Sequence, residues 1–523
     1  MRPPAALPAA LLTGLLAATS AVTMTVPAQA TATPTPTPTP TAAPTPTADA
    51  ERVVAAFGQQ SLTWRRCGRQ LRCSSVRVPL DYSDPAGAGI RLAISRPAGP
   101  MRQRAMVFNP GGPGGSAADI RQYLGYFPPA LQRRYTPIGF DPRGVAASGN
   151  LVCYTDRQLR KLVANPPRGA AAKDALFARW ARIARACSHR YPDWLGNMTT
   201  PDSARDLEVI RHALRQPRLH YLGVSYGTYL GATYAAAFPD RVGRMILDSG
   251  LSPTADMRDW LRAQSRATQQ VFRVFARDCA GAPADVCPWR GSTDDVITGY
   301  NALLRQLERH PAQPPGFPDP VTATSLAIST QGLLAQGQTG ESLLILYLQA
   351  LHPPAARPPA PQLRATAARS RALVRKVRRI TQVPANLQTV NQAVNCSDRP
   401  TADSPRTATR DARRWASFAP SFGRYFAWRP IGCAAWPVRN GDAVLPRPVS
   451  TTRRPILLLA GTRDPLTPIQ WTYQLARGFS RARVLTWTGM GHGVLGFGSD
   501  CVQRSVTGYV RTGRLPHHGR VCA

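Results

Sequence analysis

Short apolar runs alternate with amphipathic stretches along most of the chain, which is the pattern of β-strands joined by helices. The expected strands are 75–80, 90–95, 105–109, 135–140, 244–248, 454–461 and 483–487, together with a run that begins at Leu219. Helical periodicity is clear in 156–189 and 201–214. Because strands and helices alternate, the sequence predicts an α/β fold with a mostly parallel sheet.

The pattern changes between residues 255 and 449. Helical stretches such as 261–278 and 341–351 alternate there with proline-rich connections at 310–320 and 353–361. Strands typical of the core return only after this region. We interpret it as a helical cap inserted into the fold and covering a site. A separate helical domain without a catalytic part is the alternative.

The beginning of the chain differs from the rest. An apolar run from Ala5 to Val26 is followed by Ala28-Gln29-Ala30, small residues of the kind that a signal peptidase requires. Thr-Pro repeats come next, and their side chains form no core. In order, the predicted segments are a signal peptide at 1–30, a disordered Thr/Pro-rich stalk at 31–49, the first part of the core at 50–254, the cap at 255–449 and the second part of the core at 450–523.

No later segment is apolar over the length that a membrane-spanning helix needs, so integral membrane association is not expected. The sequence therefore predicts a secreted protein, free or associated with the cell wall. The net charge of +36 on 523 residues is spread along the chain, mostly as arginine, without a nucleic-acid-binding signature. We expect no nucleic-acid partner, a loose attraction to anionic cell-wall polymers, and a monomer.

Ten cysteines in an exported chain predict disulfide bonds. Their order does not fix the connectivity, but pairing each with its nearest neighbour closes five local loops. The resulting pairs are Cys67–Cys73, Cys153–Cys187, Cys279–Cys287, Cys396–Cys433 and Cys501–Cys522. Neither a metal nor a cofactor is expected, because paired C-x-x-C and H-E-x-x-H spacings are missing.

A candidate nucleophile lies where the strand that begins at Leu219 breaks. The residues Gly-Val-Ser-Tyr-Gly give a G-x-S-x-G pattern between a strand and a helix, with Ser225 flanked by Gly223 and Gly227. A sharp turn that lifts the serine hydroxyl clear of the sheet brings neighbouring backbone close, which is why glycines flank it. A glycine-rich helix start without chemistry has the same pattern, so this interpretation depends on partners elsewhere.

Two later strands supply such partners. Asp464 follows the strand at 454–461, and His492 follows the strand at 483–487. The order Ser, Asp, His is that of a hydrolase triad in which the histidine accepts the serine proton and the aspartate holds the imidazole. Asp248, at the end of an earlier strand, is the alternative acid.

A glycine-rich loop, Pro-Gly-Gly-Pro-Gly-Gly-Ser, follows the strand at 105–109. Such a loop can turn its N–H groups toward a phosphate or an oxyanion. A phosphate loop requires a lysine near its end, and none is present, so we favour the oxyanion. The predicted donors are the N–H groups of Gly112 and Tyr226, with Gly111 as the alternative to Gly112.

The next loop carries Asp141 and Arg143. Both are placed where they could touch a substrate. A buried ion pair that braces two loops is the commoner use of such residues, and we favour that structural role.

Several motifs together resemble those of a known family. They are NPGGPGGS, FDPRG, GVSYGTYLG with FPDRV and ILDSG, VNCSDRP, and AGTRDPLTP with GMGHG. From about Cys67 onward the chain is similar to the secreted actinobacterial tripeptidyl aminopeptidases, in the prolyl-iminopeptidase-like family of serine peptidases. The resemblance implies an α/β-hydrolase fold with a helical cap, no metal, and cleavage near a free peptide N-terminus. It assigns Ser225, Asp464 and His492 to the triad.

Two departures from the family pattern concern the pocket. Ala146 stands where glycine is usual, and Asn109-Pro110 precedes the glycine loop where prolyl iminopeptidases carry histidine. The second departure fits the tripeptidyl branch and leaves the choice of substrate open. An aminopeptidase also needs a carboxylate for the substrate ammonium. Glu341 and Asp398 match acidic positions of family-like motifs and are the candidates, against a solvated or structural role.

The sequence thus predicts a secreted serine exopeptidase that forms an acyl-enzyme on Ser225 and releases tripeptides or other short peptides from free N-termini. The first alternative is a carboxylesterase or lipase-like hydrolase that uses the same triad. The second is of another class, a non-catalytic protein that binds the cell envelope through the stalk and the positive surface.

Overall fold

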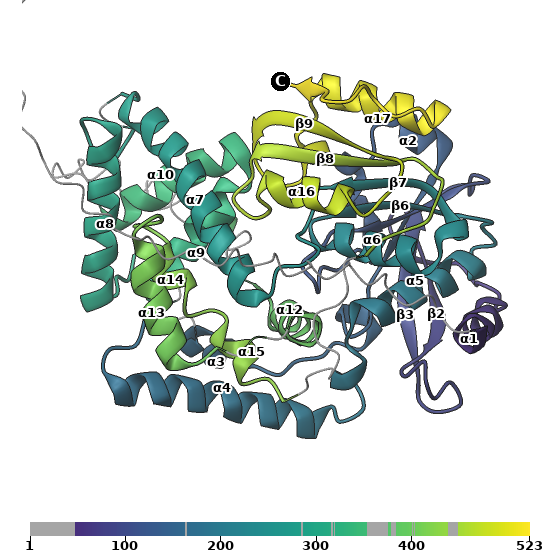
Figure 1. Cartoon of the computed structure of the whole chain (residues 1–523), viewed down its shortest axis with the longest axis horizontal. Coiled ribbons are helices and arrows are strands. Elements are labelled where there is room, and N and C mark those ends of the chain that lie inside the picture. Colours follow the sequence, from purple (N-terminus) through teal and green to yellow (C-terminus); the bar gives the residue numbers. More distant parts are fainter. Residues whose placement is uncertain are drawn as a thin grey trace, which may run out of the picture. The chain divides into compact units, whose positions relative to one another are not determined.

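The computed structural model describes residues 48–162, 165–283, 286–314, 317, 319–352, 375–377, 383–399, 401, 403–437 and 448–523. The predicted signal peptide and nearly all of the predicted stalk lie outside these residues. The first described element, helix α1 (Ala48–Gly58), begins within the last residues of the predicted stalk. Figure 1 shows the described chain from this helix to the C-terminus.

Among the described residues, ten strands form one sheet in the order β1-β2-β3-β5-β4-β6-β7-β8-β9-β10. The pairs between β5 and β10 are parallel, whereas β1, β2, β3 and β5 pair antiparallel. The strands are β1 (Arg65–Gly68), β2 (Leu71–Pro79), β3 (Gly89–Pro97), β4 (Ala105–Asn109), β5 (Thr136–Phe140), β6 (Leu219–Val224), β7 (Val242–Asp248), β8 (Ile456–Arg463), β9 (Ala482–Met490) and β10 (Val521–Cys522). The predicted mostly parallel sheet is confirmed, and the short edge strands β1 and β10 were not predicted.

Helices cover both faces of this sheet. All residues of β4 and β5 are buried, which explains their largely apolar sequences. One face packs against α5 (Thr200–Ala213) and α6 (Tyr226–Ala237), and the other against α2 (Pro129–Arg134) and α17 (Asp500–Thr512). Alternate residues of β6 face opposite layers, so that Tyr221 belongs to the first core and Leu222 to the second. Because the strands from β5 to β10 in the sheet run parallel, their C-terminal ends lie at one edge of the sheet.

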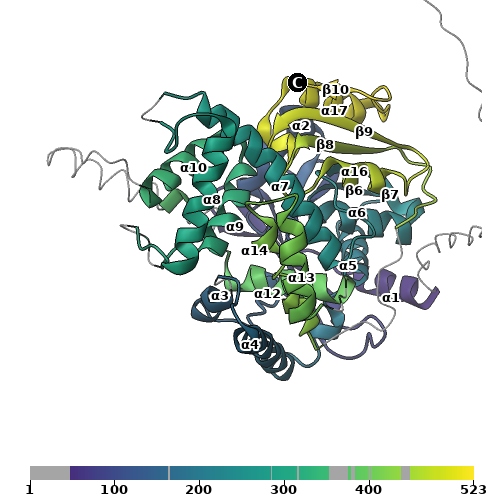
Figure 2. The ribbon, with the colours of Figure 1, turned by 60° about the vertical axis from the view of Figure 1, so that its left-hand side comes forward.

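The helical region that follows β7 has a hydrophobic cluster of its own. Its helices are α7 (Met257–Ala280), α8 (Thr293–Arg309), α9 (Ala323–Leu334), α10 (Gly337–Leu351), α12 (Ala385–Asp398), α13 (Pro405–Ala416), α14 (Gly423–Phe426) and α15 (Ile431–Ala434). Figures 1 and 2 show α7 to α10 gathered on the side of the strands opposite to α1. Helix α12 differs, since Val390 and Val394 pack into the core of the sheet.

The helical layer also receives a segment from before Ser225. Helices α3 (Asp156–Leu162) and α4 (Ala170–Arg190) follow β5 in the chain. Trp180 on α4 packs against Ile431 of α15, and Figure 1 shows α4 running below α13 and α15. The amphipathic pattern of 156–189 indicated these helices but not the surface that they would cover.

The five disulfide bonds are those predicted from nearest-neighbour pairing. Cys396–Cys433 joins α12 to α15, and Cys153–Cys187 ties the loop after β5 to α4. The described part of the chain holds no free cysteine. None of its helices combines the length and the apolar character needed to cross a bilayer.

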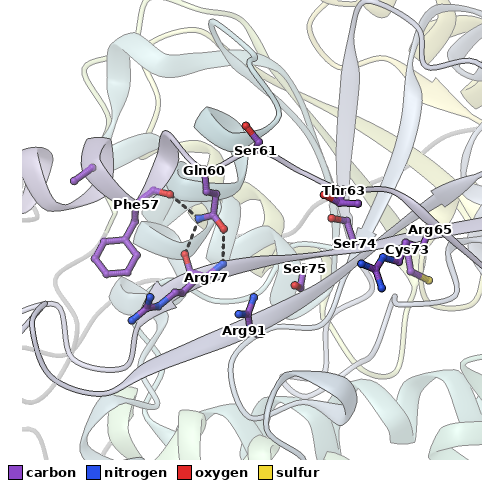
Figure 3. A pocket seen from close by; sticks show the side chains of 11 residues that line it. Phe57, Gln60, Ser61, Thr63, Arg65, Cys73, Ser74, Ser75, Arg77 and Arg91 are labelled. Atoms are coloured by element: carbon purple, nitrogen blue, oxygen red, sulfur yellow. Dashed lines mark hydrogen bonds between the residues drawn. The ribbon is translucent and has the colours of Figure 1, made fainter.

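Helix α1 is fastened to the sheet by Gln60, two residues after its end. The amide group of Gln60 donates to the carbonyl oxygens of Phe57 (2.6 Å) and Arg77 (2.8 Å) and accepts from the N–H of Arg77 (2.8 Å), as Figure 3 shows. A groove of about 960 Å³ lies between α1 and the outer strands, with Arg65 and Arg91 in its lining. The groove is far in sequence and in the sheet from the residues that carry the predicted chemistry.

Candidate active site

Ser225 lies at the sharp turn between β6 and α6. Its backbone has φ 59° and ψ −123°, a strained conformation for a residue with a side chain. A Cβ atom on Gly223 would lie 2.3 Å from the carbonyl oxygen of Gly227, and one on Gly227 would lie 2.7 Å from the carbonyl oxygen of Asn109. The flanking glycines are thus needed for close backbone approach. Ser225 is partly exposed, whereas the residues on both sides of it are buried.

Strands β8 and β9 bring the predicted acid and base together at the C-terminal edge of the sheet. His492 Nδ1 lies 2.8 Å from Asp464 Oδ2, and the carboxylate is buried. Asp464 Oδ1 accepts from the N–H groups of Leu466 (2.8 Å) and Thr467 (2.9 Å), and Oδ2 also accepts from the Thr467 hydroxyl (2.7 Å). The carboxylate is therefore held in one orientation, with one oxygen directed at the imidazole. Sequence reasoning did not identify Thr467 as part of this arrangement.

The pKa of His492 reflects two opposing effects. Burial lowers it, but the charge of Asp464 and the hydrogen bond to that carboxylate outweigh burial and raise the pKa above its usual 6.5. With Nδ1 engaged by Asp464, Nε2 is the nitrogen left to exchange a proton with a substrate or with Ser225. This is the arrangement in which a histidine serves as a general base.

Asp248, the alternative acid, has a different position. Its Oδ1 accepts from the N–H of Val494 (2.8 Å) and its Oδ2 from the N–H of Leu495 (2.9 Å), in the short helix after His492. Burial raises the pKa of Asp248 to about 6. The structure thus places Asp248 as an anchor for the loop that carries His492, and Asp464 at the imidazole itself.

The end of β7 also links this loop to Ser225. The N–H of Ser225 donates to the carbonyl oxygen of Asp248 (2.9 Å), and the N–H of Gly493 donates to the Ser249 hydroxyl (2.9 Å). Ser225 and the residue after His492 are therefore held by two consecutive residues, Asp248 and Ser249. The three predicted triad residues lie at the C-terminal ends of β6, β8 and β9, which belong to the same edge.

The glycine-rich loop after β4 lies against the nucleophile turn. A Cβ atom on Gly111 would lie 2.8 Å from the Cβ of Ser225 and 3.1 Å from the nitrogen of Tyr226. The N–H of Gly111 is already used, because it donates to Asn109 Oδ1 at 2.9 Å. Among the described residues the N–H of Gly112 has no such partner, and Tyr226 opens α6, where N–H groups lack partners within the helix. The geometry favours Gly112 over Gly111 as the second donor.

Both departures from the family pattern have structural consequences. The side chain of Asn109 sets the orientation of Gly111, a role that the sequence did not indicate. Ala146 has φ 35°, in the region that favours glycine, and its N–H donates to Asn386 of α12 at 2.9 Å. Asn386 also donates to the carbonyl oxygens of Gly144 (2.9 Å) and Leu151 (2.8 Å). Helix α12 thus fixes the loop that contains Ala146.

Asp141 and Arg143 are both buried, but they do not pair with each other. Arg143 forms two hydrogen bonds of 2.8 Å with Asp206 on α5, and Asp141 accepts from the Ser116 hydroxyl at 2.6 Å. The predicted bracing of loops by a buried ion pair therefore involves Asp206 as the acid. The sequence could not indicate this partner, which lies 63 residues away.

Asp398 is 3% exposed, at the end of α12. It accepts from the N–H of Thr200 at 3.1 Å and from the Thr200 hydroxyl, which lies 2.7 Å from the hydroxyl of Tyr226. Burial raises the pKa of Asp398 to about 7. This predicted candidate for the substrate ammonium is therefore already engaged with the protein, beside the helix that begins at Tyr226.

Glu341 has a different environment, on α10. It is half-buried, and its Oε1 is covered without a hydrogen-bond partner among the described residues. Burial raises its pKa, the charge of Asp278 adds to the rise, and Arg463 opposes it. One turn earlier, a Cβ atom on Gly337 would lie 2.8 Å from the carbonyl oxygen of Met490, close to His492 in the chain. Of the two predicted carboxylates, Glu341 is the one with an unused acceptor.

The helical region that follows β7 contacts the predicted base directly. The N–H of His492 donates to the carbonyl oxygen of Ala335 at 2.9 Å, at the end of α9. Nothing in the sequence of the proline-rich insertion indicated this contact.

A glycine-flanked serine after β6, an aspartate after β8 and a histidine after β9, on a mostly parallel sheet, define an α/β-hydrolase. The family model described as "alpha/beta hydrolase fold" matches residues 104–286, and the model described as "TAP-like protein" matches residues 419–522. The chain belongs to the tripeptidyl aminopeptidase family within the α/β-hydrolases, and it is a serine hydrolase.

Named relatives match over nearly their whole length. The chain is 32% identical to the tripeptidyl aminopeptidase of Streptomyces lividans over 499 residues, covering 90% of this chain and 88% of that protein. It is 30% identical to the serine protease Hip1 of Mycobacterium tuberculosis over 476 residues, covering 86% and 87%. It is also 30% identical to carboxylesterase B of Mycobacterium tuberculosis over 486 residues, covering 87% of each chain.

Proposed function

We propose that the protein is a secreted serine exopeptidase that forms an acyl-enzyme on Ser225 and releases short peptides, tripeptides above all, from free N-termini. The observation that carries the proposal is the directed contact of His492 Nδ1 with Asp464 on the edge that also bears Ser225. Two relatives named as peptidases support the peptide substrate. Five disulfide bonds support export to an oxidising compartment.

In the proposed reaction Ser225 Oγ attacks the carbonyl carbon of the scissile peptide bond while its proton passes to His492 Nε2. Asp464 stabilises the imidazolium that forms and keeps the proton of Nδ1 in place. The N–H groups of Gly112 and Tyr226 bind the oxyanion of the tetrahedral intermediate, and each such donor contributes about a hundred-fold to a thousand-fold in rate. His492 then protonates the leaving amine, and water completes the cycle by hydrolysing the acyl-enzyme.

We further propose that Glu341 binds the substrate ammonium. Its covered and unpartnered Oε1 is an acceptor that an ammonium group can use. Three extended residues span about 10 Å. Glu341 lies one helical turn beyond Gly337, where α10 approaches the end of β9 at Met490. Asp398, with both oxygens near Thr200, instead braces Tyr226 in this scheme.

The test compares pairs of peptide substrates that differ only in acetylation of the N-terminus, with products read by mass spectrometry. We expect Ser225→Ala to abolish hydrolysis and fluorophosphonate labelling. We expect Glu341→Gln to raise KM for the free peptide about ten-fold or more, since a charge-assisted hydrogen bond is lost, and to leave KM for acetylated peptides unchanged. Asp278→Asn, a change to a neighbouring exposed carboxylate, is the matched control. Equal effects of Glu341→Gln on both substrates would show that Glu341 does not bind the ammonium.

Carboxylester hydrolysis is the second candidate, because a relative named carboxylesterase B matches at a similar identity and coverage. The same triad and donors can serve ester substrates. A panel of p-nitrophenyl esters, assayed beside the peptides, separates the two functions. Turnover of esters without turnover of any peptide would replace the peptidase proposal with this one.

A further inference from the structure

The edge of the sheet opposite Ser225 is lined with arginine. Each of the six parallel strands from β4 to β9 is preceded, within three residues, by at least one exposed arginine. The residues nearest to these strands are Arg104, Arg134, Arg218, Arg241, Arg454 and Arg481. Because parallel strands all begin at the same edge, these side chains gather there.

Two grooves are open on this edge. The first has a volume of about 940 Å³ and is lined by Arg102, Arg104, Arg133 and Arg134, between the start of β4 and the end of α2. The second, of about 520 Å³, is lined by Arg481, Arg483 and Arg514, between the start of β9 and the end of α17. Neither groove has a carboxylate among the residues that line it. We call these seven arginines the amino-edge cluster.

Arg244 on β7 lies between the two grooves. It lies over the ring of Tyr509 on α17, with 5.7 Å between its guanidinium carbon and the ring centroid, and a Cβ atom on Gly513, in the wall of the second groove, would lie 2.4 Å from its Nη2. Its charge also acts on Tyr135 in the wall of the first groove. Helices α2 and α17 pack together, as Figures 1 and 2 show. Arg244 therefore places a positive charge between the two grooves.

The amino-edge cluster is not neutralised by the protein itself. In the described part of the chain none of its arginines forms an ion pair with a carboxylate, whereas Arg143 and Arg211 elsewhere do. The guanidinium groups of Arg102 and Arg481 donate hydrogen bonds to carbonyl oxygens, those of Gln132 and Arg453. Exposed guanidinium groups that gather on one edge can bind several anionic groups at once.

We infer that the amino-edge cluster is a docking surface for a linear phosphodiester polymer of the cell envelope. The planar guanidinium group matches the oxygens of a phosphate in a bidentate manner, and two arginine-lined grooves on one edge suit a repeating chain of phosphates. Tyr135 is the only aromatic residue in the two linings and is buried, so the surface offers no ring on which nucleic-acid bases can stack. A protein bound in this way keeps the edge with Ser225 turned away from the polymer.

The test measures binding of the full secreted chain to fluorescent poly(glycerol phosphate) by anisotropy over a range of salt concentrations. The test variant carries Arg→Gln changes at Arg104, Arg133, Arg134, Arg481, Arg483 and Arg514. The control variant has the same net charge and carries Arg→Gln changes at exposed positions in the helical region, at Arg182, Arg185, Arg305, Arg309, Arg406 and Arg413. Melting temperature and fluorophosphonate labelling establish that both variants are folded.

We expect the test variant to bind about ten-fold more weakly or worse, with a reduced dependence on salt, and the control variant to bind like the wild type. Equal weakening of polymer binding in both variants would show that net charge alone governs the affinity, and would overturn the inference. So would oligo(dT) of equal charge binding as tightly as the polymer through the same arginines, which would indicate nucleic acid. Binding to phosphatidylglycerol vesicles without binding to the polymer would indicate a lipid surface instead.

Discussion

Replacement of Asp464 by asparagine tests the orientation of the base. Asp464 Oδ1 accepts two backbone N–H groups, from Leu466 and Thr467. An asparagine must place its carbonyl oxygen there, because an amide NH₂ would face two donors. The NH₂ group then occupies the position of Oδ2, opposite His492 Nδ1. His492 can meet this donor only as the tautomer with its proton on Nε2, and that tautomer cannot accept the proton of Ser225.

The loss is expected to be about 10,000-fold in kcat, as for the same change in a serine hydrolase triad, or about 5 kcal/mol of transition-state stabilisation. KM for the same substrate should change little, because Asp464 is buried away from bound peptide. The assay is steady-state hydrolysis of a free-amine peptide, combined with the rate of fluorophosphonate labelling. Thermal melting establishes that the isosteric variant is folded.

Asp248→Asn serves as the comparison. A kcat within about ten-fold of the wild type in Asp464→Asn, together with a loss near 10,000-fold in Asp248→Asn, would refute this reasoning and make Asp248 the acid of the triad. The opposite pattern is expected, since Asp248 holds the backbone after His492 and not the imidazole.

Three further predictions follow from the same contacts. On its acid side, kcat/KM should rise with pH and have its midpoint above pH 6.5, because Asp464 raises the pKa of His492 and only the neutral imidazole accepts a proton. Initial rates between pH 5 and 9 check this. Arg143→Met should lower the free energy of unfolding by about 3–5 kcal/mol in urea, since it leaves the buried carboxylate of Asp206 without its partner. Gly223→Ala should abolish labelling and lower the melting temperature, whereas Gly196→Ala, where an added Cβ meets nothing within 4 Å, should change neither.

Local sequence patterns were sufficient for those parts of the fold that depend on neighbouring residues. The strand at 105–109 has the predicted bounds because a buried parallel strand needs an unbroken apolar run and ends where the glycines begin. Asp464 and His492 were placed as neighbours because consecutive parallel strands deliver their next residues to one edge. The disulfide pairs were also predictable, because each joins two cysteines that are neighbours along the sequence and closes a short loop.

Contacts between distant segments were not predictable. Arg143 was expected to brace two loops, but its partner Asp206 lies on a helix whose pattern shows only which face is buried. The choice between Gly111 and Gly112 depends on the side chain of Asn109, which a glycine-rich sequence does not reveal. In each case a periodic pattern indicates that a side chain is buried without indicating what it contacts.

The hydrogen bond from the N–H of His492 to the carbonyl oxygen of Ala335 ties the position of the predicted base to that of the helical region. A conformer in which the end of α9 moves away from the sheet would lose this bond, and the loop of His492 would then be held from the core side, through Asp248, Ser249 and the strand end at Arg463 and Asp464. We expect substrates that hold the helical region against the sheet to be those for which His492 is also in position. Selectivity should then appear in kcat as well as in KM, and a ligand that keeps the helical region away from the sheet should inhibit without occupying the place of the scissile bond.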